Sequence, residues 1–299
     1  MHKNGWIIYN DSLPGNKFID FAEWIQSAAE QKGSKATIFS NRDVLAYIAK
    51  NNSQILVDHL QMLPDYVVFT DKDIYLAKQL ELLGIPVFNQ SEAIRISDDK
   101  IATYQKLAAV NLPIPRTIIY PKTFFATEVK KTIIQSAVEA FGFPMIVKEA
   151  FGSFGEQVYL VHTDQELSTK IETLGTNPFM LQEFITSSYG VDLRLHVVGD
   201  QVVAAMKRQS ANDFRANVTA GGTMEAYQPN DIEQELAIKA TKAIGADFAG
   251  VDLLLGPDQN PIVCEVNSNA HIHNLYDCTG INVADFMIDY ILHTISGSD

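Results

Sequence analysis

The first ninety residues alternate short apolar runs with segments of helical periodicity. The apolar runs, which predict strands, are residues 6–9, 36–39, 66–69 and 85–88. The periodic segments, which predict helices, are residues 18–31, 44–50 and 74–83. Strands that alternate with helices indicate an open α/β sheet with a parallel core. We therefore expect a Rossmann-like N-terminal domain at residues 1–93.

The middle of the chain predicts a second α/β unit built around a hairpin with a glycine-rich tip. Asp98 is a candidate cap for a helix at residues 99–110. The further helices are expected at residues 127–141 and 164–173, and the strands at residues 116–120, 144–149, 158–161 and 179–185. We expect a central domain at residues 94–180, with the glycine-rich tip as a lid.

The C-terminal part shows strand alternation followed by helical periodicity, which is typical of an α+β arrangement. The predicted strands are residues 191–198, 201–206, 250–255 and 261–267, and the predicted helices are residues 233–245 and 285–293. The turn Gly-Pro-Asp-Gln-Asn at 256–260 favours a hairpin between the last two strands. We expect a third domain at residues 181–299.

Each strand of that last hairpin carries an acid where the pattern calls for an apolar residue. These acids are Asp252 and Glu265, and Asn267 shares the face of Glu265 because side chains alternate along a strand. Buried carboxylates need a partner, and the hairpin contains no Lys or Arg. Two carboxylates and an amide oxygen are hard ligands that suit magnesium. The alternative is a pair of half-exposed acids on an edge hairpin.

Lysines and glycines in the central part suggest contact with an anion. Lys148 lies in a core-like strand, so it must either extend to solvent or meet an anion. The loop that follows contains Gly152, Ser153 and Gly155, whose backbone N–H groups can bind phosphate. A strand follows the loop, which excludes a P-loop. An ordinary glycine hairpin remains the alternative, and Lys100 alone is compatible with a surface lysine.

A short basic segment lies between these features. Lys207, Arg208 and Arg215 occur close together, while Asp192 and Arg194 share one face of the preceding strand. In a chain whose net charge is −13, such a cluster opposite two buried acids suggests an anionic substrate bridged by metal.

The composition narrows the class of protein. Hydrophobic residues make up 46% of the 299 residues, which excludes a disordered chain. The acidic net charge argues against an extended nucleic-acid surface. Cys264 and Cys278 do not suggest a disulfide framework. Because the N-terminus lacks a signal-peptide core and no apolar run approaches transmembrane length, we expect a cytoplasmic protein without a membrane or nucleic-acid partner.

Several segments in order resemble the ATP-grasp ligases, most closely the RimK-type α-L-glutamate ligases. They are MIVKEAFGSFGEQVYLV, LQEFI, GVDLRLHVVGDQVVAAMKRQ, DFRANVTAGG, AIKATKAIGADFAGVDLLL and CEVNSN, and the similarity extends from about residue 94 to residue 292. The resemblance implies an ATP-grasp fold that joins a carboxylate to an amine. ATP phosphorylates the carboxylate, and the amine attacks the acyl-phosphate.

The resemblance also implies roles for individual residues. Lys148 and Arg215 would be catalytic, and Lys148 would contact the ATP phosphates with help from Lys100. Arg215 and Asn217 would reach the phosphates and the reacting carboxylate, and Asp192 would hold the ribose. The segment that meets adenine would be Gln182, Glu183, Phe184 and Ile185. The ligands of two magnesium ions, with manganese as a possible replacement, would be Asp252, Glu265 and Asn267, with Glu265 bridging.

The implied substrates are a small-molecule or peptide carboxylate and an amino-acid amine, and homo-oligomers are expected. The sequence departs from the family after the metal segment, where 268–274 reads SNAHIHN instead of a Ser-Pro-Gly turn. Glutamate specificity is therefore open. The candidate substrate residues are Arg194, Arg208, Asn269, His271 and His273. The two histidines would share a face in an extended chain. They could instead close a turn, and the absence of a Cys pattern disfavours a zinc pair.

Two other functions remain compatible with the sequence. One is an ATP-grasp kinase that transfers phosphate to a hydroxyl or stops at a phosphorylated product. The other is a nucleotide-binding regulator without turnover, against which the complete set of candidate catalytic and metal residues argues.

Overall fold

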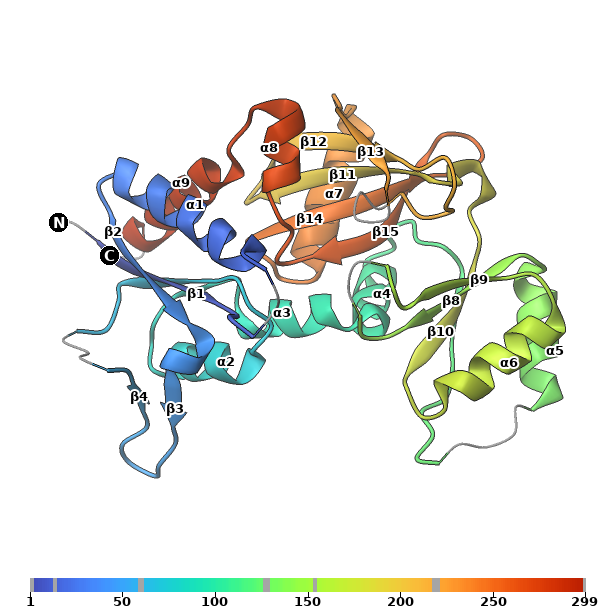
Figure 1. Cartoon of the computed structure of the whole chain (residues 1–299), viewed down its shortest axis with the longest axis horizontal. Coiled ribbons are helices and arrows are strands. Elements are labelled where there is room, and N and C mark those ends of the chain that lie inside the picture. The colour runs from blue at the N-terminus through green and yellow to red at the C-terminus, as the bar shows by residue number, and fades with distance from the viewer. Residues whose placement is uncertain are drawn as a thin grey trace.

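The computed structural model describes residues 3–12, 15–58, 62–125, 130–152, 155–216 and 221–297. Its larger sheets are built from the N-terminal, central and C-terminal parts of the chain (Figure 1).

The N-terminal sheet is parallel, with strand order β2-β1-β5-β6. The strands are β1 (Asn4–Tyr9), β2 (Lys35–Ser40), β5 (Tyr66–Phe69) and β6 (Val87–Phe88). Helix α1 (Lys17–Gln31) packs on one face, and α2 (Ile74–Leu82) belongs to a core cluster with the alternate side chains of β1 and β5. The predicted Rossmann-like arrangement of a parallel sheet between helices is confirmed.

One prediction in this part is wrong. Residues 44–50 do not form a helix; β3 (Leu45–Tyr47) and β4 (Gln54–Leu56) form an antiparallel hairpin that projects from the N-terminal sheet. A short apolar run fits both periodicities, and its pairing with residues further along the chain decides between them.

Helices α3 (Ser91–Asp98) and α4 (Lys100–Ala109) connect the N-terminal and central parts. The cap of α4 is Asp99, whose side chain accepts from the N–H groups of Ile101 and Ala102, one residue later than predicted. Helix α3 escaped prediction because its N-cap, Gln90, makes no side-chain capping bond and the segment is only two turns long.

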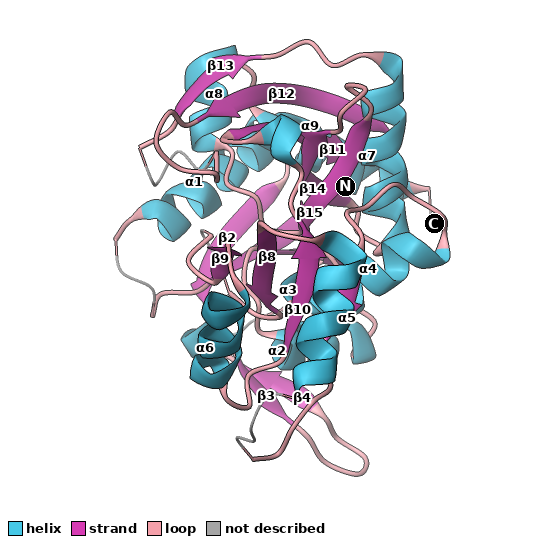
Figure 2. Cartoon of the chain, turned by 90° about the vertical axis from the view of Figure 1, so that its right-hand side faces the viewer, coloured by secondary structure: helices cyan, strands magenta, loops and turns pink. Residues whose placement is uncertain are grey.

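The central sheet is antiparallel, with order β7-β10-β8-β9. Its strands are β7 (Thr117–Ile119), β8 (Met145–Glu149), β9 (Val158–Val161) and β10 (Phe179–Glu183). Helices α5 (Lys131–Phe141) and α6 (Asp164–Leu174) pack side by side on one face of it (Figure 2). Three residues of the predicted helix 127–141, namely 127–129, lie outside the described residues.

The C-terminal sheet has the order β13-β12-β11-β14-β15. Its strands are β11 (Val191–Val198), β12 (Gln201–Gln209), β13 (Thr223–Ala226), β14 (Phe248–Leu255) and β15 (Pro261–Asn267), and a 3-10 turn, η2 (Thr186–Ser188), precedes them. The predicted hairpin of β14 and β15 is confirmed, and Asp252 lies opposite Glu265. Helix α7 (Asp231–Ala243) covers one face of the sheet.

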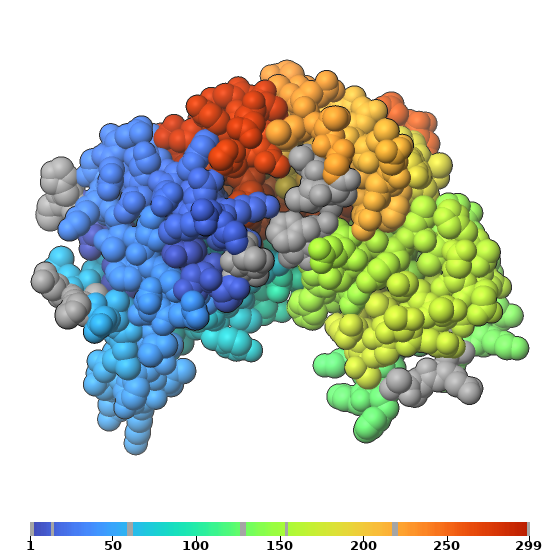
Figure 3. Space-filling view, viewed as in Figure 1, coloured from blue at the N-terminus to red at the C-terminus, as the bar shows by residue number. Residues whose placement is uncertain are grey.

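The other face of the C-terminal sheet meets the N-terminal part. Helices α8 (His273–Thr279) and α9 (Val283–Ser296) share one hydrophobic core with α1, β1 and β5. The N-terminal lobe and the central lobe extend separately beneath this joined region (Figure 3). The N-terminal and central lobes are therefore joined through the C-terminal sheet and through α3 and α4.

Candidate active site

A cavity lies where the central sheet faces the C-terminal sheet. Most of the predicted nucleotide and metal residues line it. These are Lys100, Lys148, Gly152, Gly155, Gln182, Glu183, Phe184, Ile185, Asp192, Arg215, Asp252 and Glu265. The predicted residues Ser153 and Asn217 lie outside the described part of the chain.

Sequence reasoning missed the apolar lining of this cavity. The missed apolar residues are Ile146, Val158, Val191, Phe214, Ala216 and Leu254, and the missed polar ones are Gln157, Ser188 and Cys264. In the sequence the apolar residues look like ordinary strand or loop positions, and no local signal distinguishes them from the core.

Lys148 lies on β8 and is only 7% exposed. Its Nζ lies 3.5 Å from the hydroxyl oxygen of Tyr104 and 3.7 Å from Sγ of Cys264. Burial lowers the pKa of Lys148, but Cys264, Tyr104 and Glu265 raise it, and the net shift is upward. The amine is therefore charged at neutral pH, and its neighbours leave room for an anion on the cavity side.

Tyr104 of α4 holds the floor of the cavity together. Burial raises its pKa to about 12, so the hydroxyl keeps its proton. That hydroxyl donates to the backbone oxygen of Cys264 at 2.8 Å and lies 3.4 Å from Oε1 of Gln182. The tyrosine thus ties α4, β10 and β15 to one another beneath Lys148.

Lys100 begins α4 and reaches the glycine-rich loop. Its Nζ donates to the backbone oxygen of Gly152 at 2.9 Å and lies 3.7 Å from Oε1 of Glu265. The latter distance leaves the carboxylate of Glu265 without a hydrogen bond from this lysine. Lys100 therefore lies between the glycine-rich loop and Glu265.

Arg215 contacts the lid from the opposite side. Its guanidinium forms two hydrogen bonds with Asp213, at 3.0 and 2.7 Å, and Nη1 donates to the backbone oxygen of Gly155 at 2.6 Å. The hydrogen bonds that Arg215 donates to Asp213 raise the pKa of Arg215 further. A permanent positive charge is thus held against the loop that would cover a phosphate chain.

The buried partner of Asp252 comes from neighbouring strands. Arg194 of β11 binds both carboxylate oxygens of Asp252 at 2.7 Å, and Arg208 of β12 lies 2.9 Å from Oδ2. Arg208 also forms a bidentate pair with Asp192, at 2.7 and 2.6 Å. The strand register sets Asp192 opposite Arg208 and Arg194 opposite Asp252, in two neighbouring rows of the sheet, which the hairpin sequence alone could not show.

This network sets the charges at the metal end. Burial raises the pKa of Asp252, but Arg194 and Arg208 outweigh it and lower that pKa to about 2. Burial likewise opposes the charge on Arg208, but the two aspartates raise its pKa. Asp252 is therefore ionised. Of the basic residues clustered in the sequence, Arg208 faces the buried acids, whereas Lys207 alternates to the other face and pairs with Glu225 at 3.5 Å.

The predicted metal ligands are Asp252, Glu265 and Asn267, and the first two line one end of the cavity. Asp252 and Glu265 face each other across the hairpin, and Asn267 is two residues further along β15. Of these three, Asn267 does not line the cavity as it stands. Among the described residues, no group of three or more His, Cys, Asp or Glu side chains could hold a metal; the predicted set contains two acids and an amide.

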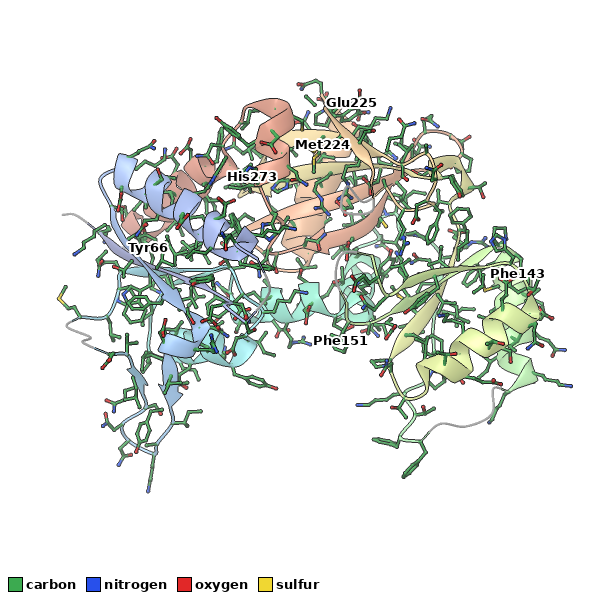
Figure 4. The ribbon with its side chains drawn as sticks, viewed as in Figure 1. Tyr66, Phe143, Phe151, Met224, Glu225 and His273 are labelled. Carbon is green, nitrogen blue, oxygen red and sulfur yellow. The ribbon has the colours of Figure 1, made fainter. Side chains whose placement is uncertain are left out.

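The two histidines of the predicted acceptor segment do not extend side by side. Helix α8 begins at His273 (Figure 4). Nδ1 of this ring donates a 2.8 Å hydrogen bond to Oδ2 of Asp20 on α1. The ring of His271 packs against Phe18 and Phe21, with centroids 5.1 and 5.6 Å apart. The chain does not stay extended here, because α8 begins at His273, and both rings contact α1.

Other predicted substrate residues take different positions. Arg194 and Arg208 are bound to aspartates, as described above, and do not line the cavity. The side chain of Asn269 donates to the backbone oxygen of Asp71 at 2.8 Å. The segment after the metal residues thus joins the C-terminal sheet to the N-terminal part.

This fold, with a cavity between the central and C-terminal sheets, is that of an ATP-grasp protein. A model of the RimK-like ATP-grasp domain family matches residues 97–291, which is more than half of the sequence. The chain therefore belongs to the RimK-like ATP-grasp family.

Named relatives cover most of the chain. A probable α-L-glutamate ligase of Trichodesmium erythraeum is 37% identical over 220 residues, covering 72% of this chain and 71% of that protein. A protein of the same name from Mannheimia succiniciproducens is 31% identical over 290 residues, covering 91% and 94%. These similarities support an ATP-dependent ligase.

A solved structure shows the same fold. The ATP-grasp ligase PsnB, complexed with minimal precursor, Mg and ADP, has a TM-score of 0.72 at 17% identity, and 98% of each chain is covered. The predicted fold class, an ATP-grasp fold preceded by a Rossmann-like domain, is confirmed. No helix within the described ranges has the length and apolar character needed to cross a membrane.

Proposed function

We propose that the chain is an ATP-dependent carboxylate–amine ligase that forms an amide or peptide bond through an acyl-phosphate and releases ADP and phosphate. One observation carries this proposal. A single cavity brings the cations Lys100, Lys148 and Arg215 together with the acids Asp252 and Glu265. The names of its relatives support the same class of reaction.

We place the adenine of ATP against residues 182–185, where β10 ends, and the ribose near Asp192. The apolar side chains of this part of the cavity suit a flat aromatic base. The phosphates would then extend toward Lys148 and Lys100, beneath the loop that contains Gly152 and Ser153. This direction brings the terminal phosphate to Asp252 and Glu265, with Arg215 on the lid side and Asn217 following it in the chain.

The residues at the metal end fit magnesium, and we propose two ions with Glu265 as the bridging ligand. Two carboxylates and an amide form a hard oxygen set, and the side chain of Glu265 is 34% exposed. Asp252 can contribute the lone pair that its arginine partners leave open, and manganese can replace magnesium at such a site. Bound magnesium would offset charge on the transferring phosphate.

The residues of the chain can meet the demands of phosphoryl transfer. Such reactions depend mostly on positioning and charge neutralisation, which the lysines and Arg215 supply. The lid is fixed by Lys100 at Gly152 and by Arg215 at Gly155. When closed, it would exclude the water that otherwise hydrolyses an acyl-phosphate.

We propose that the segment 268–274 selects the amine acceptor and makes it something other than free glutamate. The support is its departure from the small-residue turn and its position between the metal end and the N-terminal part. His271 and His273 contribute indirectly in this view, because they fix the segment against α1.

We also propose that the chain forms homo-oligomers. On the β3–β4 hairpin the apolar side chains of Leu45, Tyr47 and Leu56 are 58%, 46% and 43% exposed. Lys50 is the only charged residue between positions 44 and 57. In a chain with a net charge of −13, this neutral apolar face is where two copies repel each other least.

The test of the ligase proposal is an assay of ADP release against amino acids and small peptides, with mass spectrometry of the products. An amide product that forms with ADP supports the proposal. A phosphorylated final product would indicate the kinase, and ATP binding without ADP release would indicate the regulator.

A further inference from the structure

The strand pairing next to the cavity is irregular at one position, where β10 ends. In an antiparallel ladder, the two residues of a hydrogen-bonded pair exchange two bonds, from N–H to C=O in each direction. The register of β7 and β10, extended by one position, sets Glu183 opposite Arg116. The N–H of Glu183 donates to the backbone oxygen of Arg116 at 3.0 Å, as this pattern requires. Within the described ranges, the reciprocal bond from the N–H of Arg116 to the backbone oxygen of Glu183 is not formed.

The side chain of Glu183 takes the place of its own backbone oxygen. Oε1 accepts from the N–H of Arg116 at 2.8 Å, and Oε2 accepts from Nε of the same arginine at 2.5 Å. Both carboxylate oxygens are therefore engaged by one residue. The carboxylate keeps the N–H of Arg116 away from the acceptor that the ladder would otherwise give it.

The backbone oxygen of Glu183 is left open by this exchange. The N–H of Ala150 donates to the backbone oxygen of Pro178, so the even-numbered residues of β10 bond toward β8 and the odd-numbered ones bond toward β7. Glu183 belongs to the odd-numbered set. Across the β7 edge, no described residue donates a hydrogen bond to its backbone oxygen.

Arg116 is held where this exchange needs it. Its Nη1 donates to the backbone oxygen of Ala140 near the end of α5 at 2.8 Å, and its guanidinium carbon lies 5.7 Å from the ring centroid of Phe141. The side chain of Arg116 is 65% exposed, and an ion pair at such a position contributes little to stability. An exposed pair that diverts a ladder N–H beside a cavity is better explained by a role in that cavity.

The open oxygen belongs to a residue that lines the nucleotide cavity, as does Ile185 two residues further along. The N–H of Ile185 makes no hydrogen bond within the described part of the chain. The two residues thus offer one acceptor and one donor, both from the backbone. Adenine carries the complementary pair on one edge, because its 6-amino group donates and the neighbouring N1 accepts.

We propose that Glu183 is a positioning residue for the base of ATP: its carboxylate binds the N–H of Arg116, and the backbone oxygen that this leaves open accepts the 6-amino group. This inference rests on the proposed use of ATP. It gives the carboxylate itself no contact with the nucleotide. Without that carboxylate, the N–H of Arg116 returns to the backbone oxygen of Glu183 and closes it.

The test measures nucleotide binding by calorimetry and therefore does not depend on turnover or on the amine. The two ligands are ATP and purine riboside triphosphate, which lacks only the 6-amino group. The variants are Glu183→Ala and Glu183→Gln, whose amide oxygen still accepts from an N–H. The matched control is Glu172→Ala, which removes an exposed acid of α6 in the same lobe.

We expect wild type to bind ATP about tenfold more tightly than purine riboside triphosphate, because the 6-amino group adds one hydrogen bond. Glu183→Ala should lose this preference through weaker binding of ATP, while its affinity for purine riboside triphosphate stays unchanged. Glu183→Gln should recover most of the preference, and Glu172→Ala should match wild type. The unchanged affinity for the second ligand shows in the same experiment that the variant is folded.

Four results would overturn the proposal. They are equal binding of both nucleotides by wild type, unchanged ATP affinity in Glu183→Ala, an equal loss of affinity for both nucleotides in that variant, and a Glu183→Gln variant as weak as Glu183→Ala. If wild type binds no ATP, the ligase proposal fails and the role of Glu183 falls with it. The expected affinities without amide formation would support this role and contradict only the ligase proposal.

Discussion

Lys148 is a buried cation whose nearest neighbours are a hydroxyl and a thiol, not a carboxylate. We expect Lys148→Ala to weaken ATP binding by about 1.5–3 kcal/mol, since a hydrogen bond to a charged group contributes about that much. Titration calorimetry measures the change, with the exposed Lys239→Ala as the control. Equal ATP affinity in Lys148→Ala and wild type would remove Lys148 from the nucleotide site.

Glu265 is the candidate bridging ligand. Its replacement by Ala should abolish turnover, and EDTA should do the same to wild type, because at least one magnesium ion is then lost. Steady-state ADP release in added magnesium provides the measurement, and Glu235→Ala, an exposed acid on α7, serves as the control. Near-normal turnover of Glu265→Ala would show that the metal assignment is wrong.

His271 links stability to pH. Burial, reinforced by Lys17 and Arg194, lowers its pKa to about 3 from an ordinary value of 6.5. Between these values the unfolded chain binds a proton that the folded chain does not, so stability falls as pH falls through this window. One such group contributes a slope of about 1.4 kcal/mol per pH unit.

We therefore expect His271→Leu to flatten the dependence of the free energy of unfolding on pH between pH 6 and pH 4, as measured by urea denaturation. Part of the slope should persist, because His196 is neutral in the folded state over the same range. Parallel curves for wild type and variant would contradict the neutral, packed state of His271.

At the scale of elements, helix α7 illustrates a purely structural device. The side chain of Asn230 accepts from the N–H of Glu233, and the carboxylate of Glu233 accepts from the N–H of Asn230. We expect Asn230→Ala to lower the free energy of unfolding by about 1 kcal/mol while ATP affinity is unchanged. Chemical denaturation and calorimetry on the same variant separate the two effects, and a change in ATP affinity would contradict this division.

Elements with strong periodicity could be predicted from the sequence. The parallel N-terminal strands and the β14–β15 hairpin follow from apolar runs bounded by turn residues. The β3–β4 hairpin could not be predicted, because Leu45 and Tyr47 are exposed and their pairing with β4 is not written in the local pattern. Helix α3 could not be predicted either, because its N-cap makes no side-chain capping hydrogen bond.

The candidate site also contains residues that the sequence could predict and residues that it could not. The sequence predicts Lys148, Asp252 and Glu265 as site residues because each places a charge in an otherwise apolar strand. The partners of these residues were hidden, because Arg194 is 58 positions from Asp252 and Cys264 is 116 positions from Lys148.

At the scale of the whole molecule, the apolar face of the β3–β4 hairpin bears on assembly. We expect wild type to sediment as a homo-oligomer and the double variant Leu45→Lys, Leu56→Lys to sediment as a smaller species, because the change places charge on a self-associating apolar face. Exposed Leu82→Lys on α2 is the control. A wild type that sediments as a monomer at micromolar concentration would contradict the proposed homo-oligomer.

The N-terminal and C-terminal parts share one hydrophobic core, whereas the central sheet contributes the lid from a separate lobe. Nucleotide and acceptor are thus expected to meet at the C-terminal sheet, which both lobes face.

The most direct measurement follows oxygen from the carboxylate substrate. The substrate that supplies the carboxylate, as identified in the ADP-release assay, is labelled with ¹⁸O in that carboxylate. The phosphate formed in the presence of ATP and the amine is then analysed by mass spectrometry. An acyl-phosphate pathway transfers one labelled oxygen to each phosphate while the amide forms. Unlabelled phosphate accompanied by amide, or ADP formed without amide, would contradict the account.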